Sequence, residues 1–187
     1  MVAYVALLRG VNVGGHKPVA AAALRDLATA LKYEGAVTLL NSGNLVFRGP
    51  RKPTAAIERE FEQAAKRTLD LETEFFVHTA DEWQALVDAN PFPKEAKNDP
   101  GRLILWTLKG PVPATAAKAL QTAIKGRESF RSGKNAVYLV YSDGQGTSKL
   151  SPAVVDRALG MRGTGRNWNT ALKLCALLKN WSSGASQ

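Results

Sequence analysis

The first half of the chain alternates short apolar runs with stretches in which apolar residues recur every three or four positions. The runs are typical of buried strands, and the recurrences are typical of helices that bury one face. Leu24, Leu27 and Leu31 mark the first such helix face. The order strand, helix, strand, strand, helix, strand is predicted over residues 4–9, 24–31, 37–40, 44–47, 54–69 and 74–78. This order is that of a ferredoxin-like βαββαβ unit.

The second half repeats part of this pattern. Thr79 and Glu82 have the spacing of a capping box and predict a short helix over 81–89. The polar residues 94–101 predict a linker. Strands are then predicted over residues 103–108, 128–131 and 136–141, and helices over 113–124, 151–159 and 167–180. The sequence therefore predicts an α+β fold of two ferredoxin-like (βαββ-type) subdomains of related topology, plus C-terminal helices.

These elements divide the chain into three parts. The N-terminal α+β subdomain is expected over residues 1–93, the linker over 94–101, and a basic C-terminal α+β subdomain with two closing helices over 102–187. The composition, with 45% hydrophobic and 22% charged residues, is ordinary for a globular protein. No apolar run approaches the roughly 20 residues that a membrane-spanning helix needs.

Cysteine and histidine are scarce. Cys175 is the one cysteine, and His16 and His78 are the two histidines. A single cysteine forms no internal disulfide, and so few ligands argue against a zinc enzyme, so we expect no metal site. The first residues also lack the basic segment of a secretory signal, which together with the free cysteine favours the cytoplasm. These residue types identify no cofactor.

The net charge of +9 is unevenly distributed. Residues 1–100 hold 12 Lys and Arg against 13 Asp and Glu, a balance of −1, whereas residues 101–187 hold 13 against 3, a balance of +10. A basic half favours polyanions such as nucleic acid, phosphorylated ligands or an acidic partner. A solvated surface that keeps the protein soluble explains the same charge equally well.

A glycine-rich loop over residues 9–17 joins the first strand to the first helix. Backbone N–H groups at a helix N-terminus attract anions, and Arg9 and Lys17 add positive charge. The loop lacks the Lys-Ser/Thr step of a phosphate-binding Walker motif. Glycines that simply turn the chain are the simpler interpretation of this loop.

The segment Asn-Ser-Gly-Asn at 41–44 lies between two predicted strands. Its amides and hydroxyl are able to bind a polar ligand. The same residue types are also what a tight hairpin needs, with Gly43 taking a positive φ, and turn chemistry alone explains all of them.

A third polar segment, residues 164–170, precedes the last predicted helix. Arg166 is able to bind phosphate or carboxylate through two hydrogen bonds, and Trp168 is able to stack on a planar ligand. In the alternative interpretation Asn167 caps the helix, Trp168 belongs to the core and Arg166 is a surface charge. Lys149, just before another helix start, is a weaker candidate for contact with an anion.

Three motifs resemble those of the domain-of-unknown-function family 1697. The first is carried by Arg9, Gly10, Val11, Asn12, Val13, Gly14 and Gly15. The second is carried by Asn41, Ser42, Gly43, Asn44, Leu45, Val46 and Phe47, with Asn41 where the family has Gln. The third is carried by Thr164, Arg166, Asn167, Trp168 and Thr170, and the Lys149-Leu150 step also matches. The resemblance implies two α+β subdomains of related topology and supplies no activity.

The leading hypothesis is the binding of an anionic ligand, either nucleic acid or a phosphorylated small molecule, in a groove between the two subdomains. The candidate ligand-binding residues are Arg9, Asn12, Gly14, Gly15, Lys17, Ser42, Gly43, Asn44, Lys149, Arg166, Asn167 and Trp168. No strand carries the aromatic pattern of ferredoxin-like RNA binders, which speaks against RNA. The alternatives are an enzyme that acts on a phosphorylated metabolite or nucleotide, and a protein-interaction module without a small ligand. No catalytic residue is identified.

Overall fold

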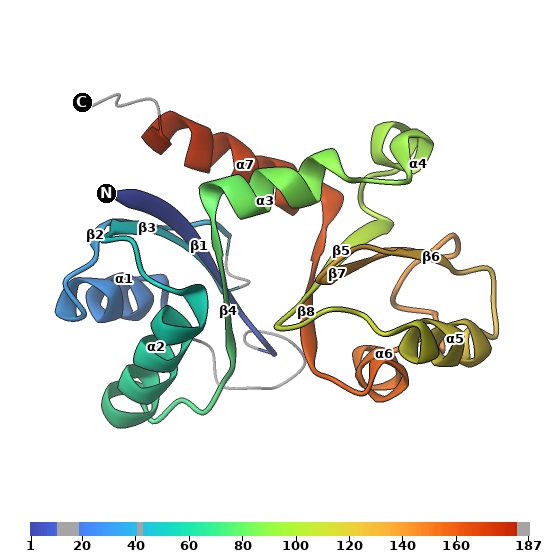
Figure 1. Ribbon diagram of the computed structural model, residues 1–187, viewed down its shortest axis with the longest axis horizontal. Helices are drawn as coiled ribbons and strands as arrows, with labels where there is room; N and C mark the ends of the chain where they lie inside the picture. Colours follow the sequence, from blue (N-terminus) through green and yellow to red (C-terminus); the bar gives the residue numbers. More distant parts are fainter. Residues whose placement is uncertain (11–18, 41–42, 183–187) are drawn as a thin grey trace. The chain divides into compact units, whose positions relative to one another are not determined.

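The computed structural model describes residues 1–10, 19–40 and 43–182 and divides into two compact units (Figure 1). The first unit comprises Met1–Ala85 and Lys173–Gln187, and the second unit comprises Leu86–Leu172. Helices α3 (Ala80–Asp88) and α7 (Trp168–Ser182) each contain a point of division. The first unit therefore takes residues from two distant parts of the chain, and the division points differ from the predicted boundaries.

The first unit is built on a four-stranded antiparallel sheet of order β2-β3-β1-β4. Its elements are β1 (Val2–Leu8), α1 (Ala21–Ala30), β2 (Glu34–Thr38), β3 (Asn44–Gly49), α2 (Thr54–Leu69) and β4 (Phe75–Thr79). The apolar stripes of α1 and α2 cover one face of the sheet, where Leu24 and Phe61 join Phe47 in the core. Every element predicted for this half is present, although β2 begins three residues before its predicted start.

The second unit has the same succession of elements. They are β5 (Leu103–Leu108), α5 (Ala114–Ala123), β6 (Ser129–Ser132), β7 (Ala136–Val140), α6 (Pro152–Leu159) and β8 (Gly163–Asn167). The sheet has the antiparallel order β6-β7-β5-β8, and Leu120 of α5 and Val155 of α6 pack on it beside Trp106. Helix α4 (Pro93–Asn98) overlaps the predicted linker over residues 94–98.

Strand β8, like α4, is an element that the sequence pattern does not predict. Its residues, Gly-Thr-Gly-Arg-Asn, contain no apolar side chain and two glycines, which are depleted in strands. It nevertheless pairs with β5 over its whole length, from Gly163 beside Leu108 to Asn167 beside Ile104. The strand completes the second four-stranded sheet, so the third polar segment begins in a strand and ends in a helix.

The capping box is confirmed. The N–H of Glu82 donates to Thr79 Oγ1 at 3.1 Å, and the N–H of Thr79 donates to Glu82 Oε2 at 2.8 Å. The two residues satisfy each other's backbone donors at the start of α3, as the spacing predicts.

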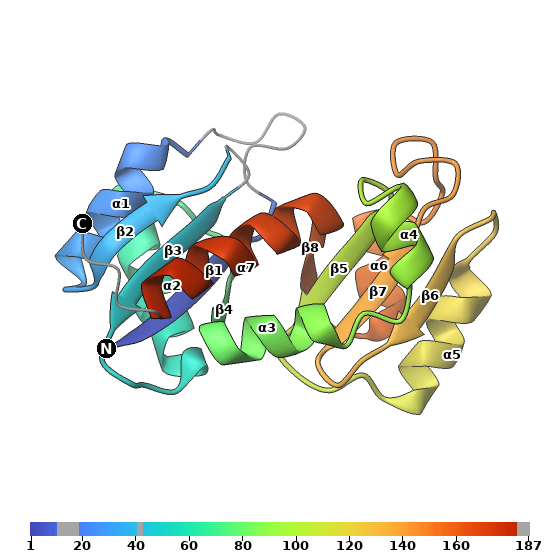
Figure 2. The ribbon, with the colours of Figure 1, turned by 90° about the horizontal axis from the view of Figure 1, so that it is seen from above.

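The central strands are covered on both faces. Residues 3–8 of β1 and all of β5 are buried. In the first unit, α7 crosses the sheet face opposite α1 and α2 (Figure 2). There the Cys175 thiol donates to Gln84 Oε1 at 2.9 Å, and the Arg48 guanidinium lies 5.6 Å from the centre of the Trp181 ring. This sheet face is therefore occupied by the protein's own helix.

Candidate functional site

The candidate residues fall into three groups. Asn12, Gly14, Gly15, Lys17 and Ser42 lie outside the described residues. Arg9, Gly43 and Asn44 belong to the first unit, and Lys149, Arg166, Asn167 and Trp168 belong to the second. The expectation that both groups share one groove stays a prediction.

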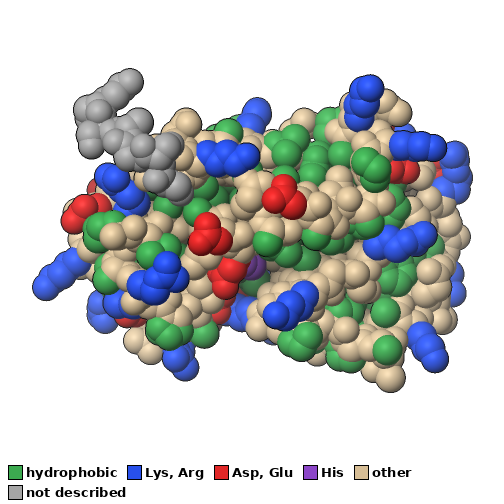
Figure 3. All heavy atoms as spheres, turned by 45° about the horizontal axis from the view of Figure 1, so that its top comes forward, with side chains coloured by type: hydrophobic (Ala, Val, Ile, Leu, Met, Phe, Trp, Pro, Cys, Tyr) green, Lys and Arg blue, Asp and Glu red, His purple; other side chains and the backbone are tan. Residues whose placement is uncertain are grey.

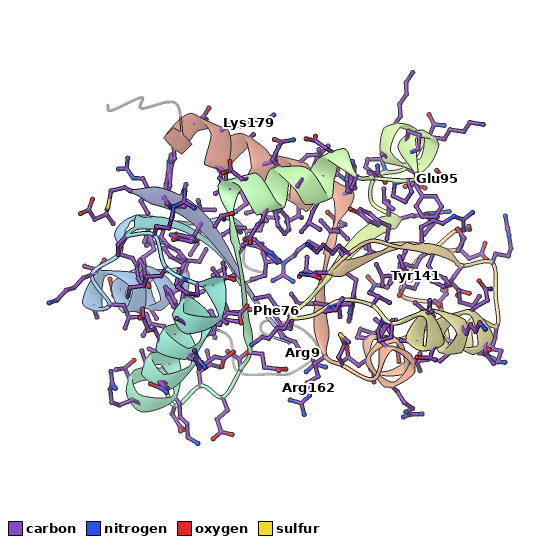
Figure 4. All side chains as sticks on the ribbon, in the orientation of Figure 1. Arg9, Phe76, Glu95, Tyr141, Arg162 and Lys179 are labelled. Atoms are coloured by element: carbon purple, nitrogen blue, oxygen red, sulfur yellow. The ribbon has the colours of Figure 1, made fainter. Side chains whose placement is uncertain are left out.

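In the first unit the chain brings Arg9 and the Gly43-Asn44 turn together. Arg9 directly follows β1 (Figure 4), and its N–H donates to the Glu74 carbonyl at 3.0 Å. The preceding residue, Leu8, donates its N–H to the Gly43 carbonyl at 2.8 Å. Two motifs that are distant in the sequence therefore adjoin at one end of the sheet.

Asn44 shapes this turn from inside. Its side chain is fully buried, and its Nδ2 donates to the Leu39 carbonyl at 2.9 Å, while the Leu39 N–H donates to the Asn44 carbonyl at 3.0 Å. Gly43 has a φ of +67°, the left-handed conformation that the hairpin pattern predicts for it. The turn chemistry expected from the sequence is confirmed at these two residues.

A shallow, open hollow lies beside this turn, between α1 and the ends of β2 and β3. Its lining residues are Val19, Ala21, Leu24, Thr38, Leu40, Gly43 and Asn44. The residue before α1, Ala20, makes no side-chain hydrogen bond to the helix start. The first backbone N–H groups of a helix carry a partial positive charge, so this wall of the hollow favours an anion.

Arg25 adds a full positive charge next to the hollow. It projects from the exposed side of α1, and its Nη1 donates to Thr38 Oγ1 at 3.2 Å. No motif marks Arg25 in the sequence, because its relation to Thr38 depends on how α1 packs against β2. The hollow thus combines a helix start, a guanidinium and a glycine turn, which is the chemistry that holds a small carboxylate or phosphate group.

Arg166 in the second unit is buried, with 8% of its surface exposed. Its Nη1 donates to Thr164 Oγ1 at 2.9 Å and to the Gly165 carbonyl at 2.8 Å. Burial lowers the pKa of its guanidinium to about 10, so it remains charged at neutral pH. The interpretation of Arg166 as a surface charge is wrong, because β8 places its side chain on a covered face of the sheet.

The expectations for the next two residues are confirmed. Asn167 Oδ1 accepts a hydrogen bond from the Thr170 N–H at 2.9 Å, which is an N-terminal cap of α7. Trp168 is buried, with 4% of its surface exposed. Both side chains therefore have structural roles, and the buried Trp168 indole offers no open face on which a ligand stacks.

Lys149 is exposed on a loop whose flanking residues, Ser148 and Leu150, take part in hydrogen bonds. The Ser148 hydroxyl donates to Glu128, and this hydrogen bond lowers the pKa of the Glu128 carboxyl. Tyr141, which Figure 4 labels, donates its hydroxyl to the Leu150 carbonyl at 3.0 Å. The loop thus presents the Lys149 ammonium to solvent from a fixed backbone.

The described part of the chain contains neither a metal-binding cluster nor a membrane-spanning helix. No group of three or more His, Cys, Asp and Glu side chains among residues 1–10, 19–40 and 43–182 is arranged to hold a metal ion. Among the helices described in these ranges, none is long and apolar enough to cross a bilayer.

Comparison with known proteins gives a family and a structural neighbour. Residues 1–138 match the model of a family described as protein of unknown function (DUF1697), a span that holds the first two motifs but not the third. No curated protein matches the chain. The structure of conserved bacterial protein SP0830 from Streptococcus pneumoniae is similar, with a TM-score of 0.73 and 20% identity, over 95% of this chain and 98% of that one. At this identity the likeness concerns the fold, whereas the family match covers most of the chain, and the protein therefore belongs to the DUF1697 family.

Proposed function

We propose that the protein binds an anionic small molecule, bearing a phosphate or carboxylate group, at the hollow beside α1. The observation that carries this proposal is the start of α1, where Ala20 provides no capping side chain, at a hollow that Thr38, the hydrogen-bond partner of Arg25, also lines. An anion there gains from the helix dipole and from the guanidinium. In the sequence, the glycine-rich first motif ends a few residues before α1 begins.

We also propose that each unit has the ferredoxin-like topology. The succession βαββαβ and the antiparallel sheet order, with the first and third strands in the centre, support this assignment in both units. Ferredoxin-like RNA binders use an open sheet surface that carries aromatic side chains. Because β1 and β5 are buried on both faces, that mode of binding finds no support here.

The basic charge favours nucleic acid as a second candidate ligand. The second unit holds 13 Lys and Arg against 6 Asp and Glu, a balance of +7. On the face seen in Figure 3, however, these cations are scattered among apolar and acidic side chains. Filter binding at two salt concentrations separates the candidates, because nucleic-acid binding weakens steeply with salt.

A thermal-shift series tests the small-molecule proposal. Inorganic phosphate, nucleotides and sugar phosphates are added to the wild-type protein and to Arg25→Gln, with sodium chloride at equal ionic strength as the reference. A ligand that binds the folded state raises Tm. Arg59→Gln is the matched control, since Arg59 is an exposed arginine of α2.

We expect at least one phosphate compound to raise the Tm of the wild type and of Arg59→Gln, and to raise the Tm of Arg25→Gln less. Equal shifts in all three proteins would place the anion elsewhere and reject this hollow. If no compound in the panel raised Tm above the chloride reference, the proposed function would be wrong.

A further inference from the structure

The hydrogen-bond donors around the hollow come from two elements of the first unit, α1 and β2. The first helical hydrogen bond of α1 is the one that the Leu24 N–H donates to the Ala20 carbonyl at 3.3 Å. The N–H groups of residues 21–23 precede that bond, so the helix itself offers them no carbonyl partner. Ala21 lines the hollow, and so does Thr38 of β2. The hollow therefore has donors both at a helix start and on the neighbouring strand.

The hydroxyl group of Thr38 is only partly engaged. Its Oγ1 accepts a hydrogen bond from Arg25 Nη1 at 3.2 Å. A hydroxyl group also has one hydrogen to donate, and within the described ranges no acceptor takes the hydroxyl hydrogen of Thr38. Because the guanidinium approaches the oxygen as a donor, that hydrogen points away from Arg25. It remains available to a ligand in the hollow.

The guanidinium of Arg25 also has unused capacity. It carries five N–H hydrogens, and one of them is bonded to Thr38. No carboxylate in the part of the chain that the structure describes forms an ion pair with Arg25. The lining residues of the hollow include no Asp or Glu, and the first turn of α1 has none either. The described groups around the hollow thus offer donors and positive charge without a competing carboxylate.

We infer that the anionic group bound here is a terminal phosphate, an assignment that rests on the proposed binding of an anion at this hollow. A carboxylate has two oxygen atoms in one plane, and a single guanidinium satisfies both with two parallel hydrogen bonds. A terminal phosphate has three acceptor oxygens that point to different sides. They match three separate donors, namely the Thr38 hydroxyl, the Arg25 guanidinium and the N–H groups at the start of α1. A phosphodiester has only two such oxygens, so the backbone of a nucleic acid fits this arrangement less well.

Titration of the full chain with methyl phosphate, dimethyl phosphate and acetate, followed by NMR of the backbone amides at pH 7.5 and constant ionic strength, tests this inference. At this pH a phosphate monoester is mostly a dianion. Methyl phosphate should shift the amide signals of residues 21–23 and bind at least several-fold more tightly than the other two anions. Equally tight binding of acetate or dimethyl phosphate at these amides would overturn the phosphate assignment and leave the proposed function intact. If none of the three anions shifted these signals, the proposed function and the inference would both be wrong.

Variants of Thr38 test the arrangement of the three donors. Thr38→Val keeps the branched shape but removes the hydroxyl, and it should weaken the binding of methyl phosphate about tenfold, whereas Thr38→Ser should bind it nearly as the wild type does. Thr29→Val is the matched control and should bind as the wild type does, because the exposed Thr29 donates to the Arg25 carbonyl at 3.1 Å and is not among the lining residues.

A double variant separates direct contact with the ligand from the positioning of Arg25. If the Thr38 hydroxyl donates to the phosphate itself, Thr38→Val should weaken binding further in the Arg25→Gln background. No further loss in that background would contradict the direct contact, and so would unchanged binding by Thr38→Val alone. Circular dichroism of each variant verifies that it is folded, so that a loss of binding reports on the hollow.

Discussion

The glycines of β8 have a steric role that substitution can measure. The indole of Trp106 lies across the strand, with Gly165 as its cross-strand neighbour. A Cβ at Gly163 would lie 2.1 Å from Trp106 Nε1 and 2.8 Å from Leu108 Cδ2, and a Cβ at Gly165 would lie 2.7 Å from Trp106 Cε3. Such distances are far below van der Waals contact, so Gly163→Ala and Gly165→Ala each force the ring or the strand to move.

The expected cost follows from the packing around the ring. Trp106 belongs to the core of the second unit and exposes 4% of its surface, so it has little free space to move into. Overfilling a packed core costs about 1–3 kcal/mol, and the shorter contact at Gly163 predicts the upper part of that range. For a chain of this length a loss of about 2 kcal/mol lowers Tm by about 4–8 °C.

Urea denaturation and thermal unfolding monitored by circular dichroism measure this loss. Gly110→Ala is the control, since a Cβ there has no neighbour within 4 Å and its φ is not positive. It should leave stability unchanged or raise it slightly, by about 0.4–1 kcal/mol. Combined with Trp106→Val, which removes the ring, Gly163→Ala should cost clearly less than it does in the wild type. Equal costs in both backgrounds, or no cost in the wild type, would refute the steric explanation.

Three further predictions concern single side chains. Glu58→Ala leaves the buried N–H of Val77 without its acceptor and should lower the free energy of unfolding, measured in urea, by about 1–3 kcal/mol. Arg59→Ala, on the exposed side of α2, is the control and should change this free energy by less than about 0.5 kcal/mol. Similar losses in the two variants would contradict the role of Glu58. Burial lowers the pKa of His78 to about 4, below the value of about 6.5 in an unfolded chain. The unfolded state therefore binds the proton more tightly, so this contribution is complete above about pH 6.5 and is lost as the pH falls toward 4. His78→Leu should flatten the fall in stability between pH 7 and 5, and parallel curves for both proteins would reject this. Asn167→Ala removes the cap of α7 and should cost about 1 kcal/mol, which an unchanged urea midpoint would contradict.

The sequence predicts those elements whose signal is local. The Thr79 and Glu82 capping box and the positive φ of Gly43 depend on a few consecutive residues, and both are present. Strand β8 has no such local signal. Its two glycines leave room for the Trp106 ring on the paired strand β5, and this need is visible only once the two strands are paired. A pattern within one segment carries no information about the large side chain that will lie across it.

Sequence patterns are equally limited in predicting which side chains of the candidate site are available to a ligand. The sequence draws attention to Asn44 as a polar side chain, and the structure shows its amide already engaged with Leu39. It also draws attention to Arg166, whose burial follows from β8. Arg25 carries no sequence signal, because its place beside Thr38 arises from the packing of α1 on β2. Residue type suggests possible chemistry, whereas tertiary packing decides which groups remain available.

The composition of the first unit from two separate stretches of the chain bears on its synthesis. The sheet of Met1–Ala85 leaves the ribosome early, but its second face is covered by the part of α7 that begins at Lys173. Until that helix emerges, Val5, Val46 and the other apolar residues of this face lack their final cover while the whole second unit is being translated. During synthesis the nascent chain thus exposes the apolar face of a nearly complete sheet. This apolar face is a binding site for a chaperone that holds unfolded chains.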